Sequence, residues 1–161
     1  SFPRLVPVFC SMRVVVQRAS QAQVKVNGVP YGDIQRGLVV LVGIEDADTE
    51  ADADWLAAKL VRLRIFSDDE GKMNANVQDV AGGMMVVSQF TLHAKTKKGT
   101  RPSFIRAAHP DHATPLYEHF VAACTRELGQ DVATGVFGGD MQVELTNDGP
   151  VTIWMDTQNK E

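Results

Sequence analysis

A group of polar side chains interrupts an apolar stretch near the middle of the chain, and its residue types could do chemistry. The stretch begins with Val86 and Val87, as a buried β-strand would. Ser88, Gln89 and Thr91 then stand where a core strand would continue with Val or Ile. Hydroxyl and amide groups lose free energy when they are buried without partners. The pattern therefore favours a strand that delivers hydroxyls and backbone N–H groups to an opening, although these side chains could also simply satisfy a strand end.

A basic run follows this polar cluster directly. Its members are Lys95, Lys97, Lys98, Arg101 and Arg106, with no acidic residue among them. Such a run is usually a solvated face, but its place after the polar strand end favours contact with phosphate groups.

The segment 147–152, Asn-Asp-Gly-Pro-Val-Thr, is the second unusual stretch. Its residues would build a hairpin turn well. The bond between Gly149 and Pro150 is also a candidate for the cis isomer. A tight turn of that kind can point two carbonyl oxygens in nearly the same direction, which makes a rigid acceptor.

The histidines give weaker signals. Pro110 separates His109 from His112, and no carboxylate or thiol completes a metal set with His119, so no metal site is expected. His93 lies two residues after Thr91, which permits a hydroxyl–imidazole pair with Thr91 as a nucleophile if the strand continues. The sequence has no Gly-Lys-Thr phosphate loop and no dinucleotide-binding fingerprint.

Length and composition indicate one domain. The chain has 161 residues, 44% hydrophobic and 22% charged, with a formal net charge of -4. Contact with nucleic acid must therefore come from a local patch. Two cysteines suit a reducing, cytosolic setting, and no apolar run is long enough to span a membrane. Met12 opens a clean strand, so we expect residues 1–11 to be an upstream or added extension and 12–161 to be the single domain.

Periodicity and turn residues predict the elements. Strands are expected at 13–18, 22–26, 29–34, 38–43, 73–80, 84–92, 141–146 and 151–156. Asn27-Gly28 indicates a hairpin. One helix should cover 49–66 with Thr49 as its cap. A second should cover 115–128, with Thr114 as its cap and Pro115 at its first position. We expect an α/β (α+β) fold: a mixed, strongly curved, barrel-like sheet with both helices packed on it.

With both motifs in view, the chain resembles the D-aminoacyl-tRNA deacylase family. The matching motifs are Ser88-Gln89-Phe90-Thr91-Leu92 and Asn147-Asp148-Gly149-Pro150-Val151-Thr152. Supporting matches are Gln17-Arg18-Ala19, Arg64-Ile65-Phe66-Ser67, Gly71-Lys72-Met73-Asn74 and Arg101-Pro102-Ser103-Phe104. The resemblance covers the chain from Met12 to Met155 in the family's order.

The resemblance implies the family's fold and a homodimeric hydrolase, without metal or cofactor, that cleaves the ester joining a D-amino acid or glycine to tRNA. Residues 88–91 of one subunit would be the catalytic strand that holds the 3′ acceptor end. Gly149 and Pro150 of the partner would enter that pocket and exclude an L side chain. Arg18 would orient this turn, and Phe137 and Met141 would line the pocket.

Lys95, Lys97, Lys98 and Arg101 would contact tRNA phosphates in this reading. Two alternatives stay open. One is a nucleic-acid-binding module like the replication-associated DNA-binding protein that eukaryotic relatives resemble. The other is a free-standing editing domain like that of archaeal threonyl-tRNA synthetases, against which the Gly-Pro turn argues.

Overall fold

The computed structural model describes residues 11–160 of the chain. The prediction about an extension concerns mostly residues outside this range. The helices are α1 (Glu50–Arg62), α2 (Pro110–Leu128) and the 3-10 turn η1 (Phe90–His93). The strands are β1 (Arg13–Val26), β2 (Val29–Ile34), β3 (Gly37–Gly43), β4 (Phe66–Ser67), β5 (Met73–Ala75), β6 (Gly83–Ser88), β7 (Ala133–Thr134) and β8 (Met141–Asp156).

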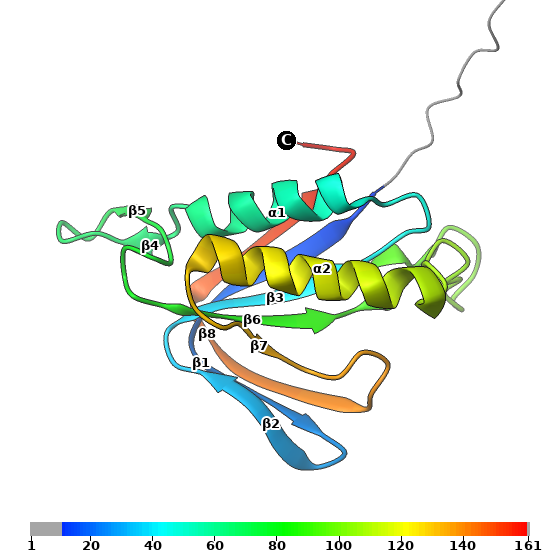
Figure 1. The fold of residues 1–161 in the computed structure, drawn as a ribbon, viewed down its shortest axis with the longest axis horizontal. Helices are drawn as coiled ribbons and strands as arrows, with labels where there is room; N and C mark the ends of the chain where they lie inside the picture. The colour runs from blue at the N-terminus through cyan, green and yellow to red at the C-terminus, as the bar shows by residue number, and fades with distance from the viewer. Residues whose placement is uncertain (1–10, 161) are drawn as a thin grey trace, which may run out of the picture.

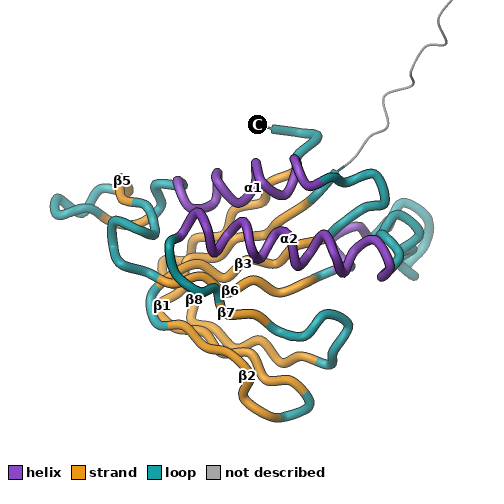
Figure 2. The backbone as a smooth tube through the Cα atoms, viewed as in Figure 1, coloured by secondary structure: helices purple, strands orange, loops and turns teal. Residues whose placement is uncertain are grey.

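One mixed sheet organises the fold, as predicted. Its strand order is β2-β1-β3-β6-β7, with β8 on the other side of β1. β3 and β6 run parallel, whereas β1 is antiparallel to β2, β3 and β8. The sheet curls beneath the two helices, which lie side by side across one face (Figures 1 and 2). β4 and β5 form a separate small ribbon.

The curled sheet separates two apolar clusters, and β3 contributes to both because alternate side chains point to opposite faces. Leu38, Val40 and Val42 pack in the larger cluster with the helices. Val39 packs on the other face, in the smaller cluster with Met85. The prediction of a central strand buried on both faces is confirmed.

Two local predictions, a hairpin turn and a helix cap, are confirmed. Asn27 and Gly28 both have positive φ, and they join β1 to β2 at the pair Val26–Val29. Thr49 caps α1 in a capping box with Asp52. The helix ends at Arg62 rather than at residue 66, because Leu63 takes an extended ψ of 124°.

The prediction for the start of α2 was wrong. The helix begins at Pro110 with His109 as its cap, and the His109 side chain accepts a hydrogen bond from the Asp111 N–H. Pro110 rather than Pro115 occupies the first helical position, where a missing N–H is harmless. Thr114 and Pro115 lie inside the helix.

The prediction of two final strands separated by a turn was also wrong. Met141–Asp156 is one strand that pairs with β1 on both sides of residues 148–151. Gln17 pairs with Thr152 and Ala19 pairs with Asn147. Residues 148–151 therefore bulge out of the strand opposite Arg18 instead of reversing the chain. The Gly149–Pro150 bond is cis, as the sequence suggested.

Asp48, between β3 and α1, has a carboxyl group in an unusual setting. It is 2% exposed, and its Oδ2 accepts a hydrogen bond of 2.7 Å from the Glu45 N–H. Burial raises the pKa of Asp48 from 3.8 to about 7, and the nearby carboxylates of Asp52, Glu45 and Asp156 add to the rise.

This shift predicts a pH-dependent stability. Between about pH 4 and about pH 7 the folded protein keeps a proton on Asp48 that the unfolded chain has released, so the free energy of unfolding should fall as pH rises through this window. Asp48→Asn cannot titrate and should lose that fall. In urea unfolding, the variant should gain more stability over the natural protein near pH 8 than near pH 5. An equal gain at both pH values would contradict the raised pKa.

Candidate functional site

A cavity of about 350 Å³ opens where β6 ends. Its wall includes Ser88, Gln89 and Phe90, and also Phe137 from the connection between β7 and β8 and Met141 at the start of β8. The structure thus brings the predicted pocket-lining residues next to three of the four predicted catalytic residues. The rest of the wall is mostly apolar or glycine: Val42, Ile44, Val87, Ala108, Ala113, Gly138, Gly139, Asp140 and Val143.

The polar motif is not a continuous strand, which corrects the prediction for residues 84–92. β6 stops at Ser88, and Phe90–His93 forms the 3-10 turn η1. The Gln89 N–H still donates to the Val42 carbonyl at 2.7 Å. The turn's first backbone bond is donated by Leu92 to Gln89 at 3.2 Å. The N–H groups of Phe90 and Thr91 therefore come before the first bond of the turn, and Phe90 lines the cavity.

Thr91 is held by its neighbour rather than by a base. The Gln89 side-chain amide donates a hydrogen bond to the Thr91 hydroxyl. The alternative pair of Thr91 with His93 does not form in the structure. Because the chain turns at η1, His93 is fully buried and lies 3.0 Å from the carboxylate of Glu45. Burial lowers the pKa of His93 below its usual value, against the opposing effects of the Gly43 carbonyl and Glu45.

The segment around Gly149 lies at the other end of the sheet. The Arg18 guanidinium donates hydrogen bonds of 2.8 Å to the carbonyls of Asp148 and Ile65. A Cβ on Gly149 would lie 3.0 Å from Arg18 Nη2, and the glycine has φ +139°. The turn therefore needs glycine and is fixed by Arg18, which fits the predicted orienting role.

The two motifs of one chain do not meet. Arg18 pairs with Leu38 on β3, whereas Ser88 pairs with Val42. These two β3 positions are four residues apart, which is about 13 Å along a strand. Gly149 and Pro150 are not part of the wall of the cavity next to Ser88.

The predicted phosphate contacts all lie on the loop between η1 and α2. Lys95, Lys97, Lys98 and Arg101 are exposed there. The loop folds back because the backbones of Lys95 and Ser103 pair with each other through hydrogen bonds of 2.7 and 2.9 Å.

Two contacts near the site were not predicted from the sequence. Phe104 packs edge-on against Phe90, with ring centroids 5.1 Å apart, and both rings are partly exposed. Arg106 lies 2.6 Å from the carboxylate of Glu45, so it belongs to an ion pair and not to a solvated basic face. The sequence hinted at Phe104 only because Arg101-Pro102-Ser103-Phe104 and the polar motif both match the same family.

Other chemical groups in residues 11–160 do not form a rival site. No cluster of three or more His, Cys, Asp or Glu side chains there could hold a metal ion. Burial raises the pKa of the Cys124 thiol to about 12, which removes it as a nucleophile. No helix in this part of the chain is long and apolar enough to cross a membrane.

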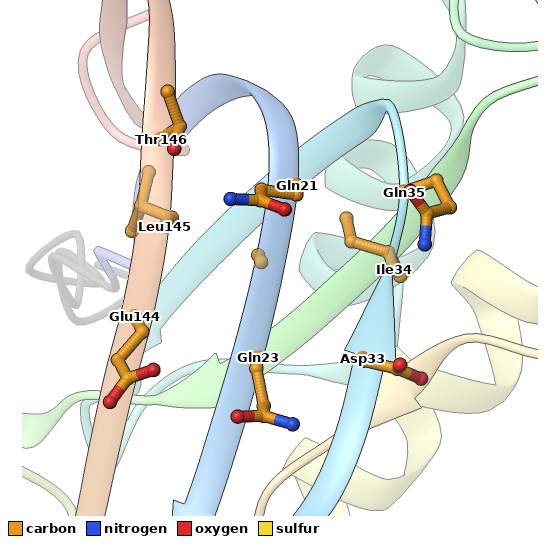
Figure 3. A pocket seen from close by; sticks show the side chains of 9 residues that line it. Gln21, Gln23, Asp33, Ile34, Gln35, Glu144, Leu145 and Thr146 are labelled. Atoms are coloured by element: carbon orange, nitrogen blue, oxygen red, sulfur yellow. The ribbon is translucent and has the colours of Figure 1, made fainter.

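A second hollow lies on the outside of β1, β2 and β8 (Figure 3). Its volume is similar, about 330 Å³. The side chains around it are mainly carboxamides and carboxylates, with no base or nucleophile set between them. They are Gln21, Ala22, Gln23, Asp33, Ile34, Gln35, Glu144, Leu145 and Thr146. The cavity at the end of β6 is therefore the better candidate.

The chain is similar to proteins of one family over most of its length. The family model described as D-Tyr-tRNA(Tyr) deacylase matches residues 15–156. Proteins named D-aminoacyl-tRNA deacylase from Flavobacterium johnsoniae and Akkermansia muciniphila are 60% and 57% identical over 150 residues, which is 93% of this chain and 100% of each relative.

Two solved structures are also similar. One, titled "c-Myc DNA Unwinding Element Binding Protein", is 37% identical, with a TM-score of 0.82 over 89% of this chain and 97% of that chain. The other, titled "Structural Analysis of a probable eukaryotic D-amino acid tRNA deacylase", has a TM-score of 0.78 over 91% of this chain and 99% of that chain. At 21% identity the second shows the fold alone.

Proposed function

The chain belongs to the D-Tyr-tRNA(Tyr) deacylase family and is a hydrolase of the ester bond in D-aminoacyl-tRNA, and we propose that the cavity at the end of β6 is where it does this. The observation that carries the proposal is the turn after Ser88, which begins in the wall of a mostly apolar cavity and leaves the N–H groups of Phe90 and Thr91 ahead of its first backbone bond. The products are tRNA and the free D-amino acid.

The chemistry needs little from side chains because the neighbouring ribose hydroxyl already activates an aminoacyl ester. Water adds to the carbonyl carbon, the bond from that carbon to the ribose oxygen breaks, and a proton passes to the ribose oxygen. The N–H groups of Phe90 and Thr91 stabilise the oxyanion between these steps. Gln89 fixes the Thr91 hydroxyl, which can anchor the attacking water.

The same proposal assigns chirality to a second subunit. The turn at Gly149 and Pro150 lies next to Arg18, which pairs with β3 four residues, or about 13 Å, from the position paired with Ser88. In a homodimer the partner's turn would enter this cavity instead. Its carbonyls would exclude an L side chain and leave room for a D side chain or glycine, including glycine misattached to tRNA(Ala). Arg18 would keep the turn in place.

The loop after η1 would bind the tRNA. Lys95, Lys97, Lys98 and Arg101 carry charge for phosphates, and Phe90 and Phe104 offer ring faces to unpaired bases. We place the protein in the cytoplasm, where aminoacyl-tRNA is made and used, and assign it no cofactor.

Activity on defined substrates tests the site and its selectivity. The protein should hydrolyse D-tyrosyl-tRNA and glycyl-tRNA about 10²-fold or more faster than L-tyrosyl-tRNA, and EDTA should have no effect. Thr91→Pro removes one backbone donor and should lower the rate about 10²–10³-fold. Loss of activity in EDTA that zinc restores would contradict the metal-free mechanism, and an unaffected Thr91→Pro variant would move the site elsewhere.

The basic loop should affect tRNA binding but not the rate of ester hydrolysis. Replacing Lys97 and Lys98 together by Ala should weaken tRNA binding and flatten its dependence on salt, because each phosphate contact releases counterions. Hydrolysis of a short D-aminoacyl-adenosine ester should change less than about two-fold. An unchanged salt slope would leave these lysines as a solvated face.

The same assay addresses DNA binding, the rival suggested by one similar structure. Duplex DNA should compete with tRNA weakly in our proposal. Tight, salt-dependent duplex binding with no deacylation would favour the rival.

The cross-subunit proposal predicts complementation. Gly149→Val disturbs the turn because even its Cβ would lie 2.9 Å from Val151 Cγ2. Thr91→Pro disturbs only the catalytic turn. Each homodimer should be inactive, whereas mixed dimers contain one intact site, so an equal mixture should recover about a quarter of normal activity. No recovery in dimers shown to be mixed would rule out the cross-subunit site.

A further inference from the structure

We propose that Glu45 is a positioning residue that fixes the catalytic turn η1 from beneath. The inference rests on the proposed site at residues 88–91 and adds a group that touches no substrate. Glu45 follows β3 by two residues, at the edge where the turn leaves the sheet.

The carboxylate of Glu45 joins the turn to the loop that follows it. Its Oε1 lies 3.0 Å from Nδ1 of His93, the last residue of η1, and 2.6 Å from Nη2 of Arg106. Neither nitrogen makes a well-aligned hydrogen bond to Oε1. The contact with Arg106 is an ion pair, whereas the contact with His93, whose pKa is lowered by burial, is a close polar contact. Glu45 is 6% exposed and His93 is fully buried, so water screens this contact little.

The backbone around Glu45 is itself fixed. Its N–H donates to Asp48 at 2.7 Å. It also forms an isolated β-bridge with Ala107, and Ala108 donates to the Ile44 carbonyl at 2.9 Å. The carboxylate therefore projects from a rigid position, which a positioning group requires.

A second contact also holds the same end of the turn. Arg13 donates a hydrogen bond of 3.0 Å to the Leu92 carbonyl and another of 3.0 Å to Asp156. Leu92 and His93 are thus held by Arg13 and by Glu45.

Phe90 and Thr91 lie within one turn of this clamped end. Their N–H groups can face the oxyanion only if the four-residue turn keeps its orientation. A displacement of about 1 Å at such a site can lower a rate about 10²-fold. The contact of Phe90 with Phe104 couples the loop to the same turn, since Arg106 is two residues further on.

The experiment compares three variants on D-tyrosyl-tRNA. Glu45→Ala removes the carboxylate, and Glu45→Gln keeps an oxygen acceptor of the same size without the charge. Glu127→Ala is the matched control, because it removes a carboxylate 3.5 Å from Arg62 in a surface pair between the helices. Folded fraction and unfolding midpoint are measured for each, and kcat and KM are expressed per folded molecule.

We expect Glu45→Ala to lower kcat about 10²-fold and Glu45→Gln about 10-fold, with KM for tRNA within about two-fold of normal. Glu127→Ala should leave both constants unchanged. If Glu45→Ala does not fold, Glu45→Gln decides. A normal kcat per folded Glu45→Gln molecule overturns the inference. The proposed site fails separately, if Thr91→Pro keeps full activity.

Discussion

Parallel pairing between β3 and β6 is the constraint on which the rest of the structure depends. It aligns Val42 with Ser88 and puts the ends of both strands at one edge of the sheet. The bond from the Gln89 N–H to the Val42 carbonyl is the last ladder contact before the chain turns. Because both strands are buried on both faces up to this edge, the polar groups of the motif can be exposed only beyond it.

Buried charged groups lie next to the polar residues at this edge of the sheet. Glu45 and His93 are buried in a region that would otherwise pack apolar side chains, and burying ionisable groups costs free energy. Arg106 offsets this by bringing an opposite charge within 2.6 Å. A hydrophobic replacement could be equally stable, but it would not bind a turn to a loop in one orientation. We interpret the Glu45–His93–Arg106 cluster as one that lowers stability in return for fixing the position of the turn.

Local signals predicted local structure well. The Thr49 cap and the Asn27-Gly28 hairpin are encoded within a few residues, and both are confirmed. The bulge in β8 could not be predicted in the same way. The segment 147–150 has the composition of a reversing turn, and only its pairing with β1, more than a hundred residues earlier, keeps the strand straight on either side. The early start of α2 was missed because His109 is an uncommon cap.

The candidate site residues likewise differ in how far the local sequence predicts them. Ser88, Gln89 and Thr91 were recognisable because their polarity breaks an apolar run, whereas Glu45 gave no signal because its partners are distant in sequence. Knowing the register also changes what the second motif can mean. Within one chain, Gly149 is fixed next to Arg18 at the far end of β3 from Val42. The same strand pairing that builds the proposed catalytic edge therefore holds the chain's own turn away from it, which is why we propose that the turn closing this cavity comes from a second copy.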